Sequence, residues 1–126
     1  MHGVDEVNNA VIRTPPHSPI MAHAWQVCQA KDPSQLKWGE TGPYLLQEVV
    51  RTFRLQGYVQ PHAVFSPYGW QDWEIALDPD IVWEFDEKTY AVHLWNEMWR
   101  RAGFNKNRSY SPDCLYEQLK SRYLHQ

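Results

Sequence analysis

Prolines limit where this chain can form helices and strands, because proline fixes φ and has no backbone N–H to donate. Nine prolines are spread over 126 residues. Three of them follow residues that suit a helix start, in Ser18-Pro19, Thr41-Gly42-Pro43 and Ser111-Pro112. At the first helical position a missing N–H costs nothing, so each of these segments predicts the beginning of a helix.

Apolar residues at helical spacing follow each of the three starts. The predicted inner faces consist of Ile20, Ala24, Val27 and Cys28; then Leu46, Val49, Val50 and Phe53; and finally Leu115, Leu119 and Tyr123. The first helix should end near Ala30, before Asp32-Pro33, and the second near Gly57. These patterns predict three amphipathic helices.

Three other apolar runs predict strands. They are residues 4–14, which end at Pro15-Pro16, the short run 63–65, and residues 90–95. Residues 96–101 read as a helical turn that stops at Gly103. Because helices and strands alternate along the chain, the predicted class is α/β, a few-stranded sheet flanked by about three helices.

Length and charge narrow the possible classes of protein. A chain of 126 residues fits a single domain, so we expect residues 1–126 to form one. The formal net charge is −3 and no basic run exceeds Arg100-Arg101, which disfavours a nucleic-acid partner. No apolar stretch approaches ~18 residues, so no membrane-spanning segment is expected in this chain. The first nine residues show no signal-peptide pattern, and the expected location is cytoplasmic.

Several common chemistries find no support in the sequence. There is no Gly-x-Ser-x-Gly motif and no phosphate-binding glycine loop. Cys28 and Cys114 lack metal-ligand spacing, so we interpret them as reduced and structural. Seven tryptophans suit a core, an interface or a sugar-stacking surface, and the composition alone does not choose among these.

Three segments carry residues suited to a binding site. The first contains Asn9, shortly before the first predicted helix. The second is Thr41-Gly42-Pro43, where the first amides of a helix lack internal partners and suit an anionic or hydroxyl-rich ligand. The third is His93-Leu94-Trp95-Asn96, at the end of a predicted strand, where side chains project into the cleft of an open α/β sheet.

In their order and separation these segments resemble the C-terminal half of glycosyltransferases that contain a sugar-binding DXD region. The branch they are most similar to comprises α-1,4-glycosyltransferases and capsular-polysaccharide enzymes. The resemblance runs through Asn9, residues 12–19, Thr41-Gly42-Pro43, Phe65-Ser66-Pro67 and residues 90–96, and so covers most of the chain.

This resemblance implies a GT-A type fold, a nucleotide-sugar donor, a glycan acceptor and retention at the anomeric carbon. It assigns His93 and Asn96 to catalysis, with His93 also a metal ligand. It assigns Thr41, Gly42, Asn9 and Trp95 to substrate binding. For each residue a plainer alternative stays open: a half-buried histidine bonded to the backbone, a well-capped helix, or an aromatic ring that only packs.

One departure from the family pattern concerns the metal. In the family, a strand ending in Asp-x-Asp lies upstream of the asparagine segment and holds a divalent ion, and this chain has no such strand before Asn9. Manganese is therefore expected only if that nucleotide-binding half is supplied separately. Asp78-Pro79-Asp80 matches the motif as a string, but it lies on the wrong side of Thr41 and its proline disfavours a regular strand, so we interpret it as a solvated turn.

The resulting hypothesis is the acceptor-side, active-site-lining portion of a retaining hexosyltransferase that is incomplete as a catalyst alone. The alternatives are a non-catalytic carbohydrate-binding or assembly module, and a remnant that pairs with a separate nucleotide-binding chain or with a second copy of itself.

Overall fold

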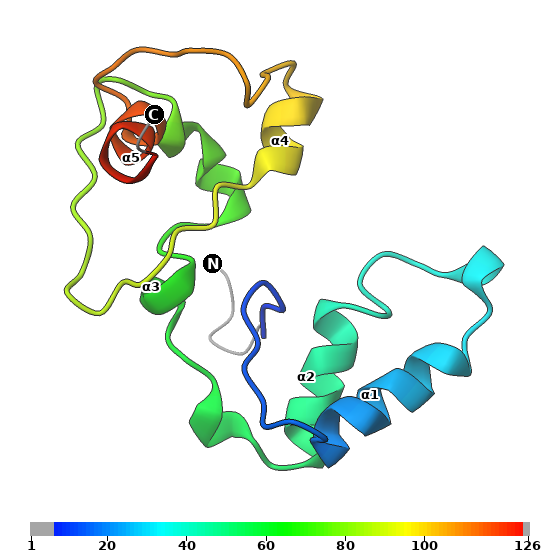
Figure 1. Cartoon of the computed structure of the whole chain (residues 1–126). Coiled ribbons are helices and arrows are strands. Elements are labelled where there is room, and N and C mark those ends of the chain that lie inside the picture. The colour runs from blue at the N-terminus through cyan, green and yellow to red at the C-terminus, as the bar shows by residue number, and fades with distance from the viewer. Residues whose placement is uncertain (1–6, 125–126) are drawn as a thin grey trace. The chain divides into compact units, whose positions relative to one another are not determined.

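The computed structural model describes residues 7–124, and all regular structure in this range is helical (Figure 1). The α-helices are α1 (Pro19–Gln29), α2 (Pro43–Thr52), α3 (His62–Phe65), α4 (Asn96–Arg101) and α5 (Leu115–Tyr123). The 3-10 helices are η1 (Pro33–Gln35), η2 (Gln56–Tyr58) and η3 (Trp70–Ala76). None of the helices in the described range is long and apolar enough to cross a membrane.

The α/β prediction is wrong, because residues 7–124 contain no strand and no sheet. Residues 63–65 fall within the single helical turn α3, in which the Val64 amide donates to the carbonyl of Pro61 at 3.0 Å. The backbone of residues 90–95 forms no ladder. The amides of Tyr90 and Ala91 both donate to one carbonyl, that of Val64, at 2.8 and 3.3 Å. Without a neighbouring strand to share backbone hydrogen bonds, this apolar run forms no β-strand.

The first predicted strand, residues 4–14, does not form in the part that the structure describes. Residues 4–6 lie outside the described range, and residues 7–14 form no regular element. The Asn8 carboxamide oxygen accepts the amide of Ala10 at 2.7 Å, a local turn that bends the backbone within the predicted strand. Val11 and Ile12 are 49% and 46% exposed, so they cover no core.

The chain divides into two compact units, Met1–Gln60 and Pro61–Gln126. In the first unit α1 packs against α2, and Val49 is the buried residue of α2, at 1% exposure. The proline-marked starts of both helices are confirmed. The end of α1 is also where the apolar spacing placed it, whereas α2 ends at Thr52 and Gly57 lies in η2.

In the second unit α4 and α5 both pack against η3. The buried residues of this unit are Val64, Tyr68, Ala76, Trp99, Cys114 and Leu115. The predicted helical turn 96–101 is confirmed as α4, and Gly103 follows it with φ +83°. The last helix starts at Leu115 rather than directly after Pro112, because a turn in which the Cys114 amide donates to the Ser111 carbonyl precedes it.

Trp99 is the largest fully buried side chain of the described core, with its ring edge-on to Tyr116 at 4.9 Å. We expect Trp99→Ala to lower the free energy of unfolding by about 3–5 kcal/mol, since it leaves a ring-sized cavity. Trp70→Ala, at a site 45% exposed in the same unit, should cost less than about 1 kcal/mol. Urea titrations followed by circular dichroism measure both. Equal losses for the two variants would show that Trp99 is not the core of this unit.

Candidate functional site

The segment His93-Leu94-Trp95 forms a tight local structure in the second unit. The Nδ1 atom of half-buried His93 accepts a hydrogen bond from the backbone amide of Trp95 at 3.1 Å. The two rings lie against each other, with centroids 3.9 Å apart and planes tilted by 35°. The Trp95 indole N–H donates to the carbonyl of Tyr68 at 3.0 Å, which ties the segment to a residue 27 positions earlier.

Trp95 has a left-handed backbone, with φ 54° and ψ 44°. Bulky residues rarely adopt this conformation, and such outliers occur where the surrounding bonds hold the residue in place. Trp95 is also the N-terminal cap of α4, and its carbonyl accepts the Met98 amide at 2.8 Å. Asn96, the exposed first residue of α4, follows directly. The left-handed turn at Trp95 therefore links the ring contact with His93 to the start of α4.

Burial lowers the pKa of His93, so its neutral form is favoured. A neutral imidazole that accepts at Nδ1 carries its proton on Nε2. The hydrogen-bonding atom of His93 that remains is thus a donor, suited to a hydroxyl or phosphate oxygen and not to a metal ion. Of the sequence-based interpretations, the one in which backbone contacts satisfy a half-buried histidine matches this geometry, although the partner is an amide rather than a carbonyl. The catalytic role of His93 stays a prediction.

Tyr68, whose carbonyl accepts the Trp95 indole N–H, forms an aromatic pair with Trp83. Tyr68 is 5% exposed, and its ring meets that of Trp83 edge-on at 5.4 Å. Burial raises the pKa of the Tyr68 phenol to about 12. Its hydroxyl and the Trp83 indole N–H are buried without a hydrogen-bond partner among residues 7–124. Tyr68 therefore stays protonated, and its role here is to present its backbone carbonyl to Trp95.

The start of α2 lies in the first unit and brings Asn9 close to Gly42. A Cβ atom on Gly42 would lie 3.3 Å from the Asn9 carboxamide nitrogen, while Thr41 is exposed beside them. The carbonyl of Gly39 accepts the amides of both Gly42 and Tyr44 at 3.1 Å. Since Pro43 has no N–H, most of the amides expected to bind a ligand are unavailable. The Gly39 carbonyl takes the place of a side-chain cap at this helix start, and ligand binding by Thr41, Gly42 and Asn9 stays a prediction.

The described residues gather no group of three or more His, Cys, Asp and Glu side chains that could hold a metal ion. Asp78-Pro79-Asp80 forms the expected turn, with the Asp80 amide donating to the Asp78 carboxylate at 2.9 Å. His93 lies in the second unit and uses Nδ1 internally. The residues of this range therefore do not fit the manganese site that the resemblance implies.

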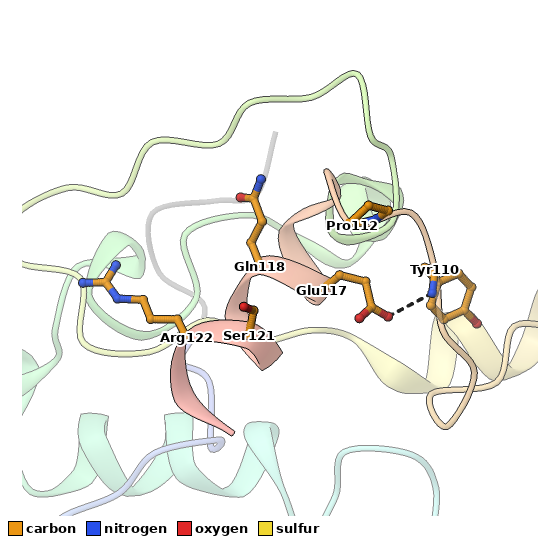
Figure 2. A pocket seen from close by; sticks show the side chains of 6 residues that line it. All are labelled: Tyr110, Pro112, Glu117, Gln118, Ser121 and Arg122. Atoms are coloured by element: carbon orange, nitrogen blue, oxygen red, sulfur yellow. Dashed lines mark hydrogen bonds between the residues drawn. The ribbon is translucent and has the colours of Figure 1, made fainter. Parts of the chain in front are cut away.

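A shallow hollow of about 400 Å³ beside α5, lined by polar and apolar groups, was not anticipated from the sequence (Figure 2). Glu117, Gln118, Ser121 and Arg122 line it from α5, and Tyr110 and Pro112 line it from the preceding segment. The Glu117 carboxylate pairs with the Lys120 ammonium at 2.6 Å and accepts the Tyr110 amide at 2.9 Å, and these bonds, the one to Lys120 foremost, lower the pKa of Glu117. The only sequence signal is the i, i+1, i+4, i+5 spacing of four polar residues. Hydroxyl-rich ligands suit such a mixture of donors and acceptors.

Two substitutions of His93 should separate its two properties. Its Nδ1 accepts a hydrogen bond, and its imidazole gains a proton as the pH falls. Its lowered pKa means that the unfolded chain binds the proton more tightly than the folded chain. The contribution of neutral His93 to the free energy of unfolding is therefore complete above pH 6.5, the ordinary pKa of histidine. It is lost as the pH falls from 6.5 toward the lowered pKa of the folded chain. We expect His93→Phe to cost about 1 kcal/mol at pH 7, because the Trp95 amide loses its acceptor.

His93→Asn is the matched control, since an asparagine oxygen accepts an amide two residues ahead, as Asn8 and Asn105 do in this chain. Its stability should match the unsubstituted chain at pH 7 and show a weaker loss between pH 7 and pH 5. Thermal unfolding across that range measures both properties. A pH profile for His93→Asn identical to that of the unsubstituted chain would contradict the assignment.

Comparison with known proteins assigns the chain to a family. A family model described as the alpha 1,4-glycosyltransferase conserved region matches residues 16–123. Lactosylceramide 4-alpha-galactosyltransferases from Homo sapiens and Gorilla gorilla gorilla are each 29% identical to it and the one from Mus musculus is 28% identical, in alignments that cover 68% of this chain. The chain spans only 27% of the human and mouse proteins and 29% of the gorilla protein.

No solved structure matches the chain. The family model, however, covers far more than half of the chain and includes both the start of α2 and the His93–Asn96 segment. The resemblance read from the sequence is thereby confirmed: the chain belongs to the α-1,4-glycosyltransferase family.

Proposed function

We propose that this chain supplies the acceptor-side part of a retaining hexosyltransferase that takes its sugar from a nucleotide donor. Family membership over residues 16–123 supports a role in glycosyl transfer. The names of the relatives specify addition of galactose to lactosylceramide, a saccharide attached to a lipid. A galactose-containing glycan is therefore the acceptor class that we propose for this chain.

The observation that carries the proposal is the fixed geometry of His93, Trp95 and Asn96. Nε2–H of half-buried His93 and the carboxamide of exposed Asn96 are available as hydrogen-bonding groups, and the half-buried Trp95 ring lies between them in the sequence. Sugar rings bind to such combinations, with C–H groups on the aromatic face and hydroxyls on the polar groups. Because Trp95 is already held by three hydrogen bonds, little ordering remains to be done when a sugar binds.

The proposal assigns the chemistry of the departing diphosphate to groups other than the described residues. A divalent ion on an Asp-x-Asp pair would stabilise the negative charge that develops there. Residues 7–124 bring no such ligand set together. The residues of this chain act on the acceptor: they bind its hydroxyls, orient the attacking one and exclude water from it.

The absence of a gathered ligand set among the described residues also favours a second candidate, a carbohydrate-binding module that has no catalytic partner. The two candidates differ in whether a nucleotide-sugar donor changes their binding of the saccharide. A transferase part should respond to a nucleotide sugar once the acceptor is bound and the carboxylate-bearing polypeptide is present. A binding module should respond to the saccharide alone.

Titration of the ¹⁵N-labelled chain with lactose tests the proposal. We expect lactose to shift the Trp95 indole and Asn96 amide signals without any metal, and Asn96→Ala to weaken binding by about tenfold, the effect of losing one hydrogen bond of about 1.4 kcal/mol. Trp70→Ala, an exposed ring elsewhere in the same unit, is the matched control and should leave the affinity unchanged.

Addition of UDP-galactose and Mn²⁺ to the lactose-bound chain completes the test. These additions should have little effect on the chain alone and should produce transfer to lactose when the nucleotide-binding polypeptide is added. Lactose shifts that miss residues 93–96, or that persist unchanged in Asn96→Ala, would refute the acceptor-side assignment.

A further inference from the structure

The sequence contains one motif for the attachment of an oligosaccharide to asparagine. This motif is Asn-x-Ser or Asn-x-Thr with any residue but proline in the middle, and it occurs here as Asn107-Arg108-Ser109. None of the other asparagines has a serine or threonine two positions further on. Motifs of three residues are common by chance, so the place of this one in the structure decides whether it suits a modification.

The motif lies in the connection between α4 and α5, which is orange in Figure 1. Lys106 and Asn107 are the central residues of a turn in which the Arg108 amide donates to the Asn105 carbonyl at 3.1 Å. Residues 101–109 are all exposed. A bulky group attached in this stretch therefore extends into solvent, as glycans on surface loops do.

The two side-chain groups that the modification requires are available. The Asn107 backbone amide donates to the Asn105 carboxamide oxygen at 2.9 Å, but the Asn107 carboxamide itself has no hydrogen-bond partner within residues 7–124. The same holds for the hydroxyl of Ser109. The acceptor nitrogen and the hydroxyl two residues ahead are thus both free for an enzyme to bind.

Two tyrosines hold the turn from the side of the core. The Tyr110 hydroxyl donates to the Asn105 carbonyl at 2.7 Å, and the Tyr116 hydroxyl donates to the Lys106 carbonyl at 2.8 Å. The Tyr116 ring in turn meets the buried Trp99 ring edge-on at 4.9 Å. The residues before the acceptor asparagine are therefore anchored, and a saccharide on that asparagine displaces no buried side chain.

From the single motif, the exposed turn and the free carboxamide and hydroxyl we propose that Asn107 carries an N-linked oligosaccharide. An oligosaccharyltransferase would supply it from a lipid-diphosphate-linked donor. The Asn107 carboxamide nitrogen attacks the anomeric carbon of the donor, a C–N bond forms, and the bond from that carbon to the diphosphate oxygen breaks. The lipid diphosphate departs with the bonding electron pair, and the proton released from the nitrogen balances its new charge.

This proposal conflicts with the cytoplasmic location expected from the sequence, because N-linked glycans are found on surface loops of secreted proteins. That expectation depended on the lack of a signal-peptide pattern in the first nine residues. An occupied Asn107 would correct it. The proposal also goes beyond the proposed function, since Asn107 receives a saccharide as a modification and no step depends on the His93–Asn96 segment.

Secretion of the chain from a eukaryotic host, behind a cleavable signal peptide, tests whether Asn107 accepts a glycan. We expect an intact mass increased by one oligosaccharide. Peptide-N-glycosidase should remove it and leave an aspartate at position 107, which tandem mass spectrometry locates. Asn107→Gln should abolish the modification, and circular dichroism verifies that this variant keeps its helices.

Ser109→Ala and Ser109→Thr are a matched pair, because both change an exposed residue whose side chain makes no hydrogen bond among the described residues. Ser109→Ala removes the hydroxyl and should abolish the glycan. Ser109→Thr keeps the hydroxyl and should retain the glycan. Occupancy in Ser109→Ala equal to that of the unsubstituted chain would show that the attachment does not use this motif.

The same mass analysis of the protein purified from its natural source completes the test. Chymotrypsin is the suitable protease, since trypsin would cut at Lys106 and Arg108. We expect the peptide that contains Asn107 to carry a saccharide. An unmodified Asn107, in the secreted chain or in the natural protein, would overturn the inference. Failure of lactose to bind a chain with an occupied Asn107 would refute the proposed function alone.

Discussion

Trp95 is held by three hydrogen bonds, and the geometry of the candidate site depends on them. Its amide is bound by His93, its indole by the Tyr68 carbonyl, and its own carbonyl by the Met98 amide at the start of α4. Together these contacts maintain a left-handed backbone that a tryptophan seldom adopts. The Trp95 and His93 rings are thereby held in place without support from a sheet.

The same constraint changes the expected role of His93. A histidine that ligates a metal ion needs a nitrogen lone pair directed at the metal, and its second nitrogen usually donates to an acceptor. In this structure Nδ1 accepts an amide, so the neutral ring offers Nε2–H. His93 repeats with an imidazole what Asn8, Asp78 and Asn105 do with their side-chain oxygens, which is to accept the backbone amide two residues ahead. The hydrogen-bonding pattern is that of a local turn.

The sequence predicted the features that depend on local chemistry. Proline at the first helical position located the starts of α1 and α2, and Gly103 marked the end of α4. The strand predictions failed because a strand requires a partner, which local patterns do not reveal. Residues 90–95 are apolar enough for a strand, yet the amides of Tyr90 and Ala91 both donate to the Val64 carbonyl in α3. The family resemblance was confirmed, whereas the hollow beside α5 depends on packing that spacing alone could not specify.

The protonation pattern of the His93 ring is the most direct test of this account. Long-range ¹H–¹⁵N correlation spectra of the ¹⁵N-labelled chain at pH 7 distinguish an unprotonated, hydrogen-bonded Nδ1 from a protonated one. We expect a neutral ring with its proton on Nε2, and an Nδ1 signal that changes when the hydrogen bond from the Trp95 amide is lost. A ring with its proton on Nδ1 and an unprotonated Nε2, the form in which Nε2 could bind a metal ion, would contradict this assignment.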